Sequence, residues 1–411
     1  MTADGGSLLA EDLANAIPSG ARLVFSMGCH SGLAVSDAVV GASAASDDLP
    51  AAITARGAVY VASTGYGYGD QVSIGLQERL MTLFAGELDG AVSLGDALRN
   101  AKQEYFASQG LYGAYDEKAL ASTILYGLPT FAIGTERPAR PVPPSRLVTP
   151  VAGSNGLFSD TYDESFDFVE RSGDIGHWFE ADAGQGPQLP QITAGRPTQP
   201  RSELDVTADA GDGTLLPAHG AVVTVLDTDR VVTDFDAAFS RPTLDNAAEP
   251  EAVNSVAAFP TRLAGVTTAS NDQGLVGPDG IAQRQQLVMI PGQFLAGGDS
   301  AGGTGTQMLF DRMAGQLYYS TSNDWTPARV VDVGVVRSAG ATSADLSVVA
   351  ADLSGVSRVV ALYQAGGTTW SSVDLDDTGG TFTATVPVPA SVTNEQIRVV
   401  VQVVDGAGNV A

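Results

Sequence analysis

The only cysteine of the chain lies where a nucleophile would be expected. Cys29 follows the apolar run Leu23 to Met27 and stands between Gly28 and the segment His30 to Gly32. A thiol attacks a carbonyl carbon as the thiolate, so it needs a nearby base and backbone N–H groups around it. The end of a buried strand that opens into a glycine turn provides exposure and such donors. The pattern predicts a nucleophile position at Cys29; a buried structural cysteine is the alternative interpretation.

The chain has three histidines that could serve as a base for this thiol. His30 follows Cys29 directly, and neighbours in an extended segment point to opposite sides, so we expect a polar loop residue beside the site. His177 and His219 do not end any strand expected near Cys29, and we expect both on the surface. The sequence therefore offers no well-placed base.

The segment Thr64 to Asp70 is the second candidate part of a site. Its three glycines allow close backbone approach, so Tyr66 or Tyr68 could line a substrate cleft, although a plain turn needs no function. Asp70 and Asp37 are the candidates for an acidic residue at the floor of a specificity pocket.

Acidic turns are the only features that suggest a metal ion. Asp352 to Gly355 and Asp405 to Asn409 could bind calcium, but an Asp side chain that accepts hydrogen bonds from its own turn is the simpler explanation. We therefore expect no metal and no cofactor. A solvated acidic loop is expected to contain Asp227, Asp229, Asp234 and Asp236.

Length and charge narrow the class of protein. A chain of 411 residues predicts two to three domains, and a hydrophobic content of 44% excludes general disorder. The net charge of −26 argues against nucleic acid or an anionic membrane as partner. One cysteine excludes an internal disulfide and a thiolate metal cluster. The N-terminus has no signal-peptide pattern, and no apolar run approaches the roughly 20 residues of a membrane span.

Apolar periodicity predicts an α/β arrangement up to residue 134. Two largely apolar runs, 23–27 and 57–63, are typical of strands buried on both faces of a parallel sheet. Amphipathic patterns predict helices around 9–17, 76–84 and 94–105. A further helix is expected from Asp116, as its N-cap, to Leu125, followed by a last strand at 128–133. The succession indicates α/β layers around a mostly parallel sheet.

The rest of the chain shows strand signals. Residues 135–202 begin with a proline-rich stretch and continue rich in Gly, Pro, Asp and Ser, so we interpret them as a linker region with isolated strands. Residues 203–329 are expected to form a β-rich domain. The regular strand spacing in 330–411 predicts an immunoglobulin-like sandwich, with Trp370 as a core aromatic and a closing strand that is not evident.

The residues around Cys29 resemble a known family. Phe25 to Leu33 is similar to the nucleophile strand of the gingipain family of cysteine peptidases, which belong with caspases, legumains and clostripain, and Gly28 fills the small position before the nucleophile. Three later segments resemble that family's following strand, a later helix and the turn into its last strand: Arg56 to Thr64, Leu94 to Lys102 and Leu125 to Pro129.

The resemblance covers roughly residues 7 to 134 and implies the later half of a caspase-like three-layer domain that hydrolyses polypeptides. In that family a His-Gly pair on the preceding strand supplies the base and part of the oxyanion hole, and only 28 residues precede Cys29, none of them histidine. We therefore expect the 411 residues alone to be inactive. The later β segments loosely resemble those of large secreted bacterial proteins, which implies an extracellular or cell-surface location. A non-catalytic adhesion or scaffold protein is the alternative.

Overall fold

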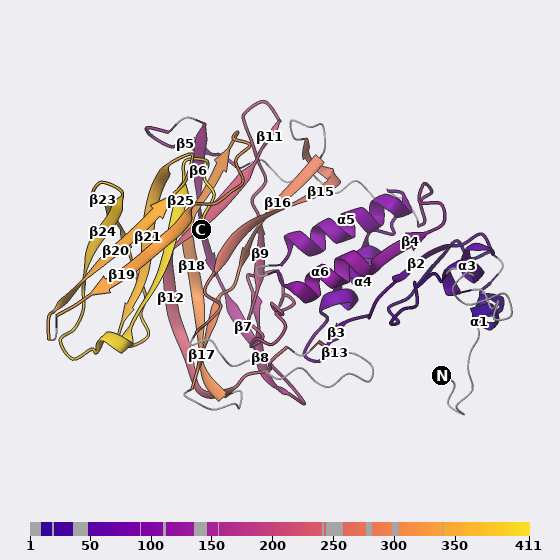
Figure 1. The fold of residues 1–411 in the computed structure, drawn as a ribbon, viewed down its shortest axis with the longest axis horizontal. Coiled ribbons are helices and arrows are strands. Elements are labelled where there is room, and N and C mark those ends of the chain that lie inside the picture. Colours follow the sequence, from indigo (N-terminus) through magenta and orange to yellow (C-terminus); the bar gives the residue numbers. More distant parts are fainter. Residues whose placement is uncertain are drawn as a thin grey trace.

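The computed structural model divides into three regions that follow each other along its long axis (Figure 1). We name them the α/β region (10–134), the central body (146–320) and the terminal module (329–411). Strands predominate and form several separate sheets, as expected for most of the chain. The structure describes residues 10–18, 20–35, 48–90, 92–109, 112–134, 146–154, 156–240, 242–243, 258–276, 282–297, 304–338 and 340–411.

The α/β region has a three-stranded sheet in the order β1-β2-β4. Strand β1 (Leu23–Phe25) runs parallel to β2 (Val59–Ser63), and β4 (Thr123–Tyr126) runs antiparallel to β2. One of the two pairings is thus parallel, and the carboxyl ends of β1 and β2 meet at one edge of the sheet.

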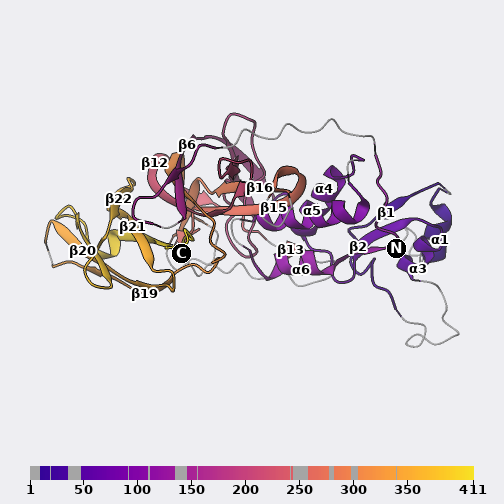
Figure 2. The same ribbon diagram turned by 90° about the horizontal axis from the view of Figure 1, so that it is seen from above.

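Helices lie against both faces of this sheet. On one face lie α4 (Leu76–Gly86) and α5 (Leu94–Ala107), with α6 (Ala114–Ser122) beside α4. On the other face lie α1 (Ala10–Ala16) and α3 (Leu49–Thr54). Figure 2 shows the same region from above, with α1 and α3 at the far end from the central body.

The alternation of side chains along β2 explains this arrangement. Val59 and Val61 are buried against α4 and α5, whereas Tyr60 and Ala62 are buried against Ile53 of α3. All five residues of β2 are buried, which agrees with its largely apolar sequence.

Two predictions for the end of the α/β region are wrong. Residues 128–133 form no strand; the last strand is β4, inside the stretch expected to be helical. The β-branched residues Thr123 and Ile124 favour the extended conformation there. Asp116 is not the N-cap of α6 but its third residue, where its carboxylate accepts a hydrogen bond from the Gly113 N–H at 2.8 Å.

The central body contains two main sheets that share one core. Its long strands β12 (Ala218–Asp236) and β18 (Thr304–Ser320) pair antiparallel over most of their length. In the first sheet they are joined by β5 (Thr149–Pro150), β6 (Leu157–Ser165), β14 (Ala258–Phe259) and β17 (Gly292–Ala296). The second sheet consists of β9 (Ser202–Asp205), β15 (Ala264–Val276) and β16 (Ala282–Met289).

Short pairs complete the central body and join it to the α/β region. The hairpin β7 (Asp167–Gly173) and β8 (Gly176–Asp182) follows β6, and β10 (Ala208–Asp209) pairs with β11 (Leu215–Leu216). The pair of β3 (Gly69–Asp70) with β13 (Pro242–Thr243) joins the α/β region to the central body.

The region interpreted as a linker contains more regular structure than expected. Residues 157–165 form β6, which pairs along its whole length with β18, and 167–182 form a hairpin. The expected acidic loop is also wrong, because Asp227 to Asp236 belong to β12. There the Asp227 carboxylate pairs with Arg312 at 3.1 Å across the strands.

The terminal module consists of two sheets around one core. One sheet has the order β19-β20-β24-β23, with β19 (Arg329–Val336), β20 (Ser343–Ala351), β24 (Thr381–Pro387) and β23 (Asp376–Asp377). The other has the order β22-β21-β25, with β22 (Ser371–Asp374), β21 (Val356–Ala365) and β25 (Ile397–Asp405). A short 3-10 helix, η1 (Asn394–Gln396), precedes β25. This arrangement is consistent with the expected immunoglobulin-like sandwich.

Trp370 is buried, but not in the core of the terminal module. Its side chain is 6% exposed and belongs to the core of the central body, as does Leu362 of β21. The β22-β21-β25 sheet therefore contacts apolar side chains on both faces. Among the described residues, no helix is long and apolar enough to cross a membrane.

Candidate functional site

Cys29 lies in a tight turn just after β1. The turn is closed by hydrogen bonds from the Ser31 N–H and the Ser31 hydroxyl to the Gly28 carbonyl oxygen, at 3.2 and 2.7 Å. The Tyr60 hydroxyl of β2 donates to the Ser31 carbonyl at 3.0 Å. The cysteine side chain is half-buried, so the thiol keeps an accessible side.

The segment that follows β2 runs alongside this turn. The His30 N–H donates to the Gly65 carbonyl at 2.7 Å, and the Gly32 N–H donates to the Ser63 carbonyl at 2.7 Å. The two loops at the carboxyl ends of the parallel strands are therefore joined by backbone hydrogen bonds. In open parallel sheets this is the edge at which ligands bind.

The thiol contacts the backbone of Gly67. The Gly67 N–H donates to Cys29 Sγ at 3.3 Å, and Sγ lies 3.7 Å from the Gly67 carbonyl oxygen. A side chain at position 67 would overlap the Met27 carbonyl oxygen and would come within 3.0 Å of Gln77 Oε1. Glycine is thus required for this approach of backbone to thiol, which the Gly-rich sequence hinted at without indicating the partner.

The backbone N–H of Cys29 makes no hydrogen bond to any residue that the structure describes. It is located beside the Sγ atom of the same residue. A free backbone N–H next to a nucleophile can stabilise the oxyanion that forms when the nucleophile adds to a carbonyl. The Cys29 turn thus combines a thiol with one such donor.

His30 does not contact the thiol. Its backbone is in the left-handed region, with φ of 53°, so the turn is not the extended segment assumed from the sequence. Its ring lies edge-on to the exposed Tyr66, with ring centroids 4.5 Å apart. His30 and Tyr66 thus form one exposed pair of rings near the thiol.

Tyr68 and Asp70 make contacts within the folded structure and do not form the expected lining of a cleft. Tyr68 is 7% exposed and packs edge-on against Tyr115 of α6, with Lys118 above both rings. The Asp70 carboxylate accepts hydrogen bonds from the Val72 N–H at 2.8 Å and the Ser73 N–H at 3.3 Å. Asp37 lies outside the described residues.

Asp70 also connects this loop to the central body through a hydrogen bond. The hydroxyl of the fully buried Ser240 donates to its carboxylate at 2.5 Å, beside the backbone pairing of β3 with β13. Burial raises the pKa of Asp70, while the hydrogen bond from Ser240 opposes that rise. Because Asp70 lies three residues after Gly67, the central body helps to fix the loop that contacts Cys29. No local pattern in the sequence indicates this pairing of distant segments.

Gln77 is a further residue that sequence reasoning missed. It is 1% exposed, at the start of α4, and neither atom of its side-chain amide has a hydrogen-bond partner in the structure. Its Oε1 would lie 3.0 Å from a Cβ atom at position 67. A buried polar group of this kind in the wall of a loop could have been found only from the fold.

His219 is the only buried histidine, contrary to the expected surface position. It is 7% exposed, its ring stacks on Trp325 at 4.0 Å, and its Nδ1 lies 3.0 Å from Asn409 Oδ1. Burial lowers the pKa of His219, which keeps the imidazole neutral. His219 belongs to the central body and does not take part in the Cys29 site. His177, also in the central body, is partly exposed.

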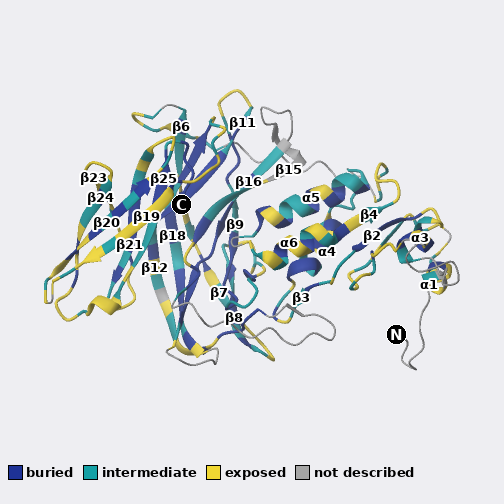
Figure 3. Ribbon diagram, viewed as in Figure 1, coloured by how far each residue is buried: buried dark blue, intermediate teal, exposed yellow. Residues whose placement is uncertain are grey.

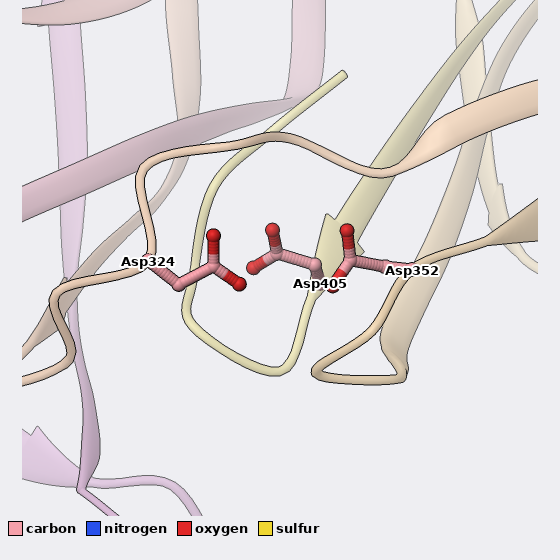
Figure 4. A group of neighbouring side chains, drawn as sticks. All are labelled: Asp324, Asp352 and Asp405. Carbon is pink, nitrogen blue, oxygen red and sulfur yellow. The ribbon is translucent and has the colours of Figure 1, made fainter.

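Three carboxylates meet where the central body joins the terminal module. Oxygen atoms of Asp324, Asp352 and Asp405 lie within 4.8 Å of one another (Figure 4). Their turns explain much of this geometry: Asp352 accepts from the Ser354 N–H at 2.7 Å, and Asp405 accepts from the Ala407 N–H at 2.9 Å. The expected hydrogen bonding of each Asp to its own turn is confirmed. Carboxylate oxygens are also ligands that calcium prefers.

Comparisons with models of known protein families and with curated proteins find no match to this chain. The chemistry of the Cys29 site is therefore inferred from the contacts of its own residues. A partly exposed thiol is positioned by backbone groups at the carboxyl edge of two parallel strands, and the N–H beside it bonds to none of the described residues. Such an arrangement can add to a carbonyl carbon once a base has removed the thiol proton.

Proposed function

We propose that Cys29 is the nucleophile of a cysteine-type endopeptidase that acts on polypeptides. The observation that carries the proposal is the placement of Sγ: at the carboxyl edge of β1 and β2, 3.3 Å from the Gly67 N–H and beside the free N–H of Cys29. With helices on both faces of the sheet, this supports a caspase-like three-layer domain of the gingipain type for the α/β region. The resemblance of 25–33 to that family's nucleophile strand supports it further.

The reaction is an acyl transfer through the thiol. The Cys29 thiolate adds to the peptide carbonyl, the C–N bond breaks as the amine leaves with a proton, and a thioester forms; water then hydrolyses it and regenerates the thiol. None of the described contacts brings a histidine to Sγ, so the proposal assigns the general base to a histidine outside these 411 residues. Residues 1–411 alone are accordingly expected to hydrolyse peptides negligibly.

Chemical rescue tests the proposal on this chain. An activated acyl ester, such as a p-nitrophenyl ester of a protected amino acid, needs no protonation of its leaving group, and free imidazole can replace a missing histidine base. We expect the wild-type chain to release p-nitrophenol faster than the protein-free solution at the same imidazole concentration, by an excess that grows with imidazole, and Cys29→Ala to abolish that excess. Mass spectrometry of the quenched reaction should find the acyl group on Cys29.

Ser31→Ala is the matched control, because Ser31 bonds to the Gly28 carbonyl in the same turn but contacts no reacting atom in the proposal. It should retain the imidazole-dependent rate within about threefold. Equal rates in the wild type and Cys29→Ala across the imidazole series would show that Cys29 is not a nucleophile here.

A non-catalytic adhesion or scaffold protein is the second candidate. It is favoured by the mostly β structure and by the absence of a described contact between any histidine and the thiol. The rescue experiment separates the two, because a scaffold predicts no imidazole-dependent acylation of Cys29. Both candidates fit the proposed extracellular or cell-surface location. The net charge of −26 favours solubility in such a setting.

A further inference from the structure

A cavity of about 840 Å³ lies in the central body, close to its junction with the terminal module. Most of its lining comes from three elements: the turn between β10 and β11, the paired strands β15 and β16, and the segment 321–328 between β18 and β19. Figure 3 shows the turn between β10 and β11 as exposed. Asp212 of that turn and Trp325 of the segment are both exposed, so the cavity is open to solvent. Its volume is in the roughly 300–1,000 Å³ range of small-ligand sites.

Trp325 gives this cavity a flat aromatic surface. It is 55% exposed, whereas Trp178 and Trp370, the other two tryptophans of the chain, are buried. The ring of His219 covers one face of the indole, with centroids 4.0 Å apart and an angle of 8° between the ring planes. The exposed area of Trp325 therefore belongs to the opposite face and to the ring edges. A ligand ring can stack on that face.

Hydrogen bonds hold this aromatic surface in place. The Ser322 hydroxyl accepts from the Asp324 N–H at 3.1 Å, and the Asp324 carbonyl accepts from the Asn409 side-chain amide at 3.0 Å. The same amide positions the ring beneath Trp325, because Asn409 Oδ1 lies 3.0 Å from His219 Nδ1. A surface that is fixed before a ligand arrives loses little conformational entropy on binding.

Polar side chains form much of the remaining wall. Its two charged residues have opposite signs: the Asp212 carboxylate accepts from the Thr214 N–H at 2.8 Å, and Arg262 Nε donates to the Ala264 carbonyl at 3.3 Å. Hydroxyl and amide groups both donate and accept hydrogen bonds, a carboxylate accepts and a guanidinium donates. Hydroxyl and amide side chains line the cavity from all three elements, among them Thr214, Thr267, Thr268, Gln283, Thr321 and Asn323. The wall thus suits a ligand with several O–H groups.

We propose that this cavity binds a neutral saccharide of one or two pyranose rings. The C–H groups on one face of a sugar ring pack on the open face of the Trp325 indole, whose π-electrons make that face negative. The hydroxyl groups around the sugar ring exchange hydrogen bonds with the polar side chains of the wall. The proposal is independent of the chemistry of Cys29.

The walls of the cavity favour a saccharide over other ring ligands. An aromatic ligand would also stack on Trp325, but it would take hydroxyl and amide groups of the wall out of water without replacing their hydrogen bonds, which is unfavourable. A ligand with a net charge would be attracted by one of Asp212 and Arg262 and repelled by the other. A neutral ring with many hydroxyl groups matches both the aromatic and the polar part of the lining.

Tryptophan fluorescence of the full 411-residue chain tests the site. Because Trp178 and Trp370 are buried, quenching by acrylamide reports mainly on Trp325. The probes are maltose, cellobiose, lactose and N,N′-diacetylchitobiose, and we expect at least one of them to protect Trp325 from quenching in a saturable manner. Sorbitol has hydroxyl groups but no ring face and should give no saturable effect. The amide of N-acetylphenylalanine has a ring without sugar hydroxyls and should bind more weakly than the best disaccharide.

Three variants, measured by titration calorimetry, locate the binding. Trp325→Ala removes the stacking surface and should weaken binding at least about tenfold, whereas Trp325→Phe keeps an aromatic face and should stay within about threefold of the wild type. Tyr66→Ala is the matched control, because Tyr66 is an aromatic residue with 51% exposure that does not line the cavity. Circular dichroism and the melting temperature should verify that each variant is folded.

Four results would overturn the proposal. The first is the absence of a saturable effect of all four disaccharides on the folded wild type, and the second is equal affinity of the wild type and Trp325→Ala. The third is an effect of sorbitol equal to that of the disaccharides, since stacking on a ring face would then not contribute. The fourth is tighter binding of the N-acetylphenylalanine amide than of every disaccharide, which would assign the cavity to an aromatic ligand instead.

Discussion

The turn that holds Cys29 and the turn that holds Asn409 are built on opposite principles. Each follows a strand and contains glycines. The Cys29 turn is fixed mainly by backbone hydrogen bonds, and its thiol has only the Gly67 backbone as partner. The side chain of Asn409 is bonded to His219, Asp405 and Asp324. A side chain that makes few hydrogen bonds can react, whereas a side chain whose polar atoms are all hydrogen-bonded stabilises the structure.

Asn409→Ala should have the largest effect on stability. It removes the Asn409 side-chain hydrogen bonds to the buried His219 Nδ1, to Asp405 Oδ2 and to the Asp324 carbonyl oxygen. Unsatisfied buried groups cost about 1–3 kcal/mol each, so we expect the free energy of unfolding to fall by about 3 kcal/mol in urea denaturation. Asn323→Ala, at an exposed neighbour, should change it by less than about 0.5 kcal/mol. Similar values for both would remove the contrast between the turns.

Gly67→Val should affect the reaction more than the stability. The added side chain overlaps the Met27 carbonyl and displaces the loop that contacts the thiol. We expect the imidazole-dependent acylation of Cys29 to slow at least about tenfold, since small displacements near a reacting group are costly. Gly65→Ala is the matched control: its Cβ would lie 3.6 Å from that of Ser122, an ordinary contact. A normal rate in Gly67→Val would show that the backbone contact does not position the thiol.

Ser240→Ala tests whether the central body supports the Cys29 turn from a distance. It removes one of the hydrogen bonds to Asp70, and we expect the unfolding free energy to fall by about 1–2 kcal/mol. The alkylation rate of Cys29 by iodoacetamide should also change, because Asp70 and Gly67 belong to one loop. Ser172→Ala, at an exposed position of the hairpin, should alter neither measurement.

His219→Gln should have the smallest effect, visible only as a change in pH dependence. Burial lowers the pKa of His219 below 6.5, so the folded state binds its proton less readily than the unfolded state. The stability that the neutral ring contributes is present above pH 6.5 and is lost as the pH falls through and below that value. The melting temperature of the wild type should therefore fall more steeply below pH 6.5 than that of the variant. His30→Gln, at an exposed position, should follow the wild type.

The strands of the terminal module were predictable because each is short and regular. The expected strands around 345–350, 357–363 and 381–386 lie within β20, β21 and β24. The length of β12 was not predictable, because repeated register shifts against β18 interrupt its alternation of apolar and polar residues. Local patterns thus identify regular strands and fail where distant pairing extends a strand.

Only those features of the candidate site that depend on neighbouring residues in the sequence were predictable. A strand that ends at Gly28 was enough to locate Cys29 in a turn. The orientation of Tyr68 toward Tyr115, the contact of Gly67 with the thiol and the tie of Asp70 to Ser240 all depend on segments far apart in the chain. His219 was missed for the same reason, since its partner Asn409 is 190 residues away.

The pairing of Gly69–Asp70 with Pro242–Thr243 has a consequence for dividing this protein into pieces. A single engineered protease cut between residues 134 and 146 would not separate the α/β region from the central body. The two fragments would stay together through this pairing, through Asp70 and Ser240, and through Arg79 of α4, which lies 3.7 Å from Glu203 of β9. An expressed α/β region alone would lack half of each of these contacts. The boundary that the sequence indicates therefore divides the chain into segments. It does not divide the folded structure that surrounds Cys29.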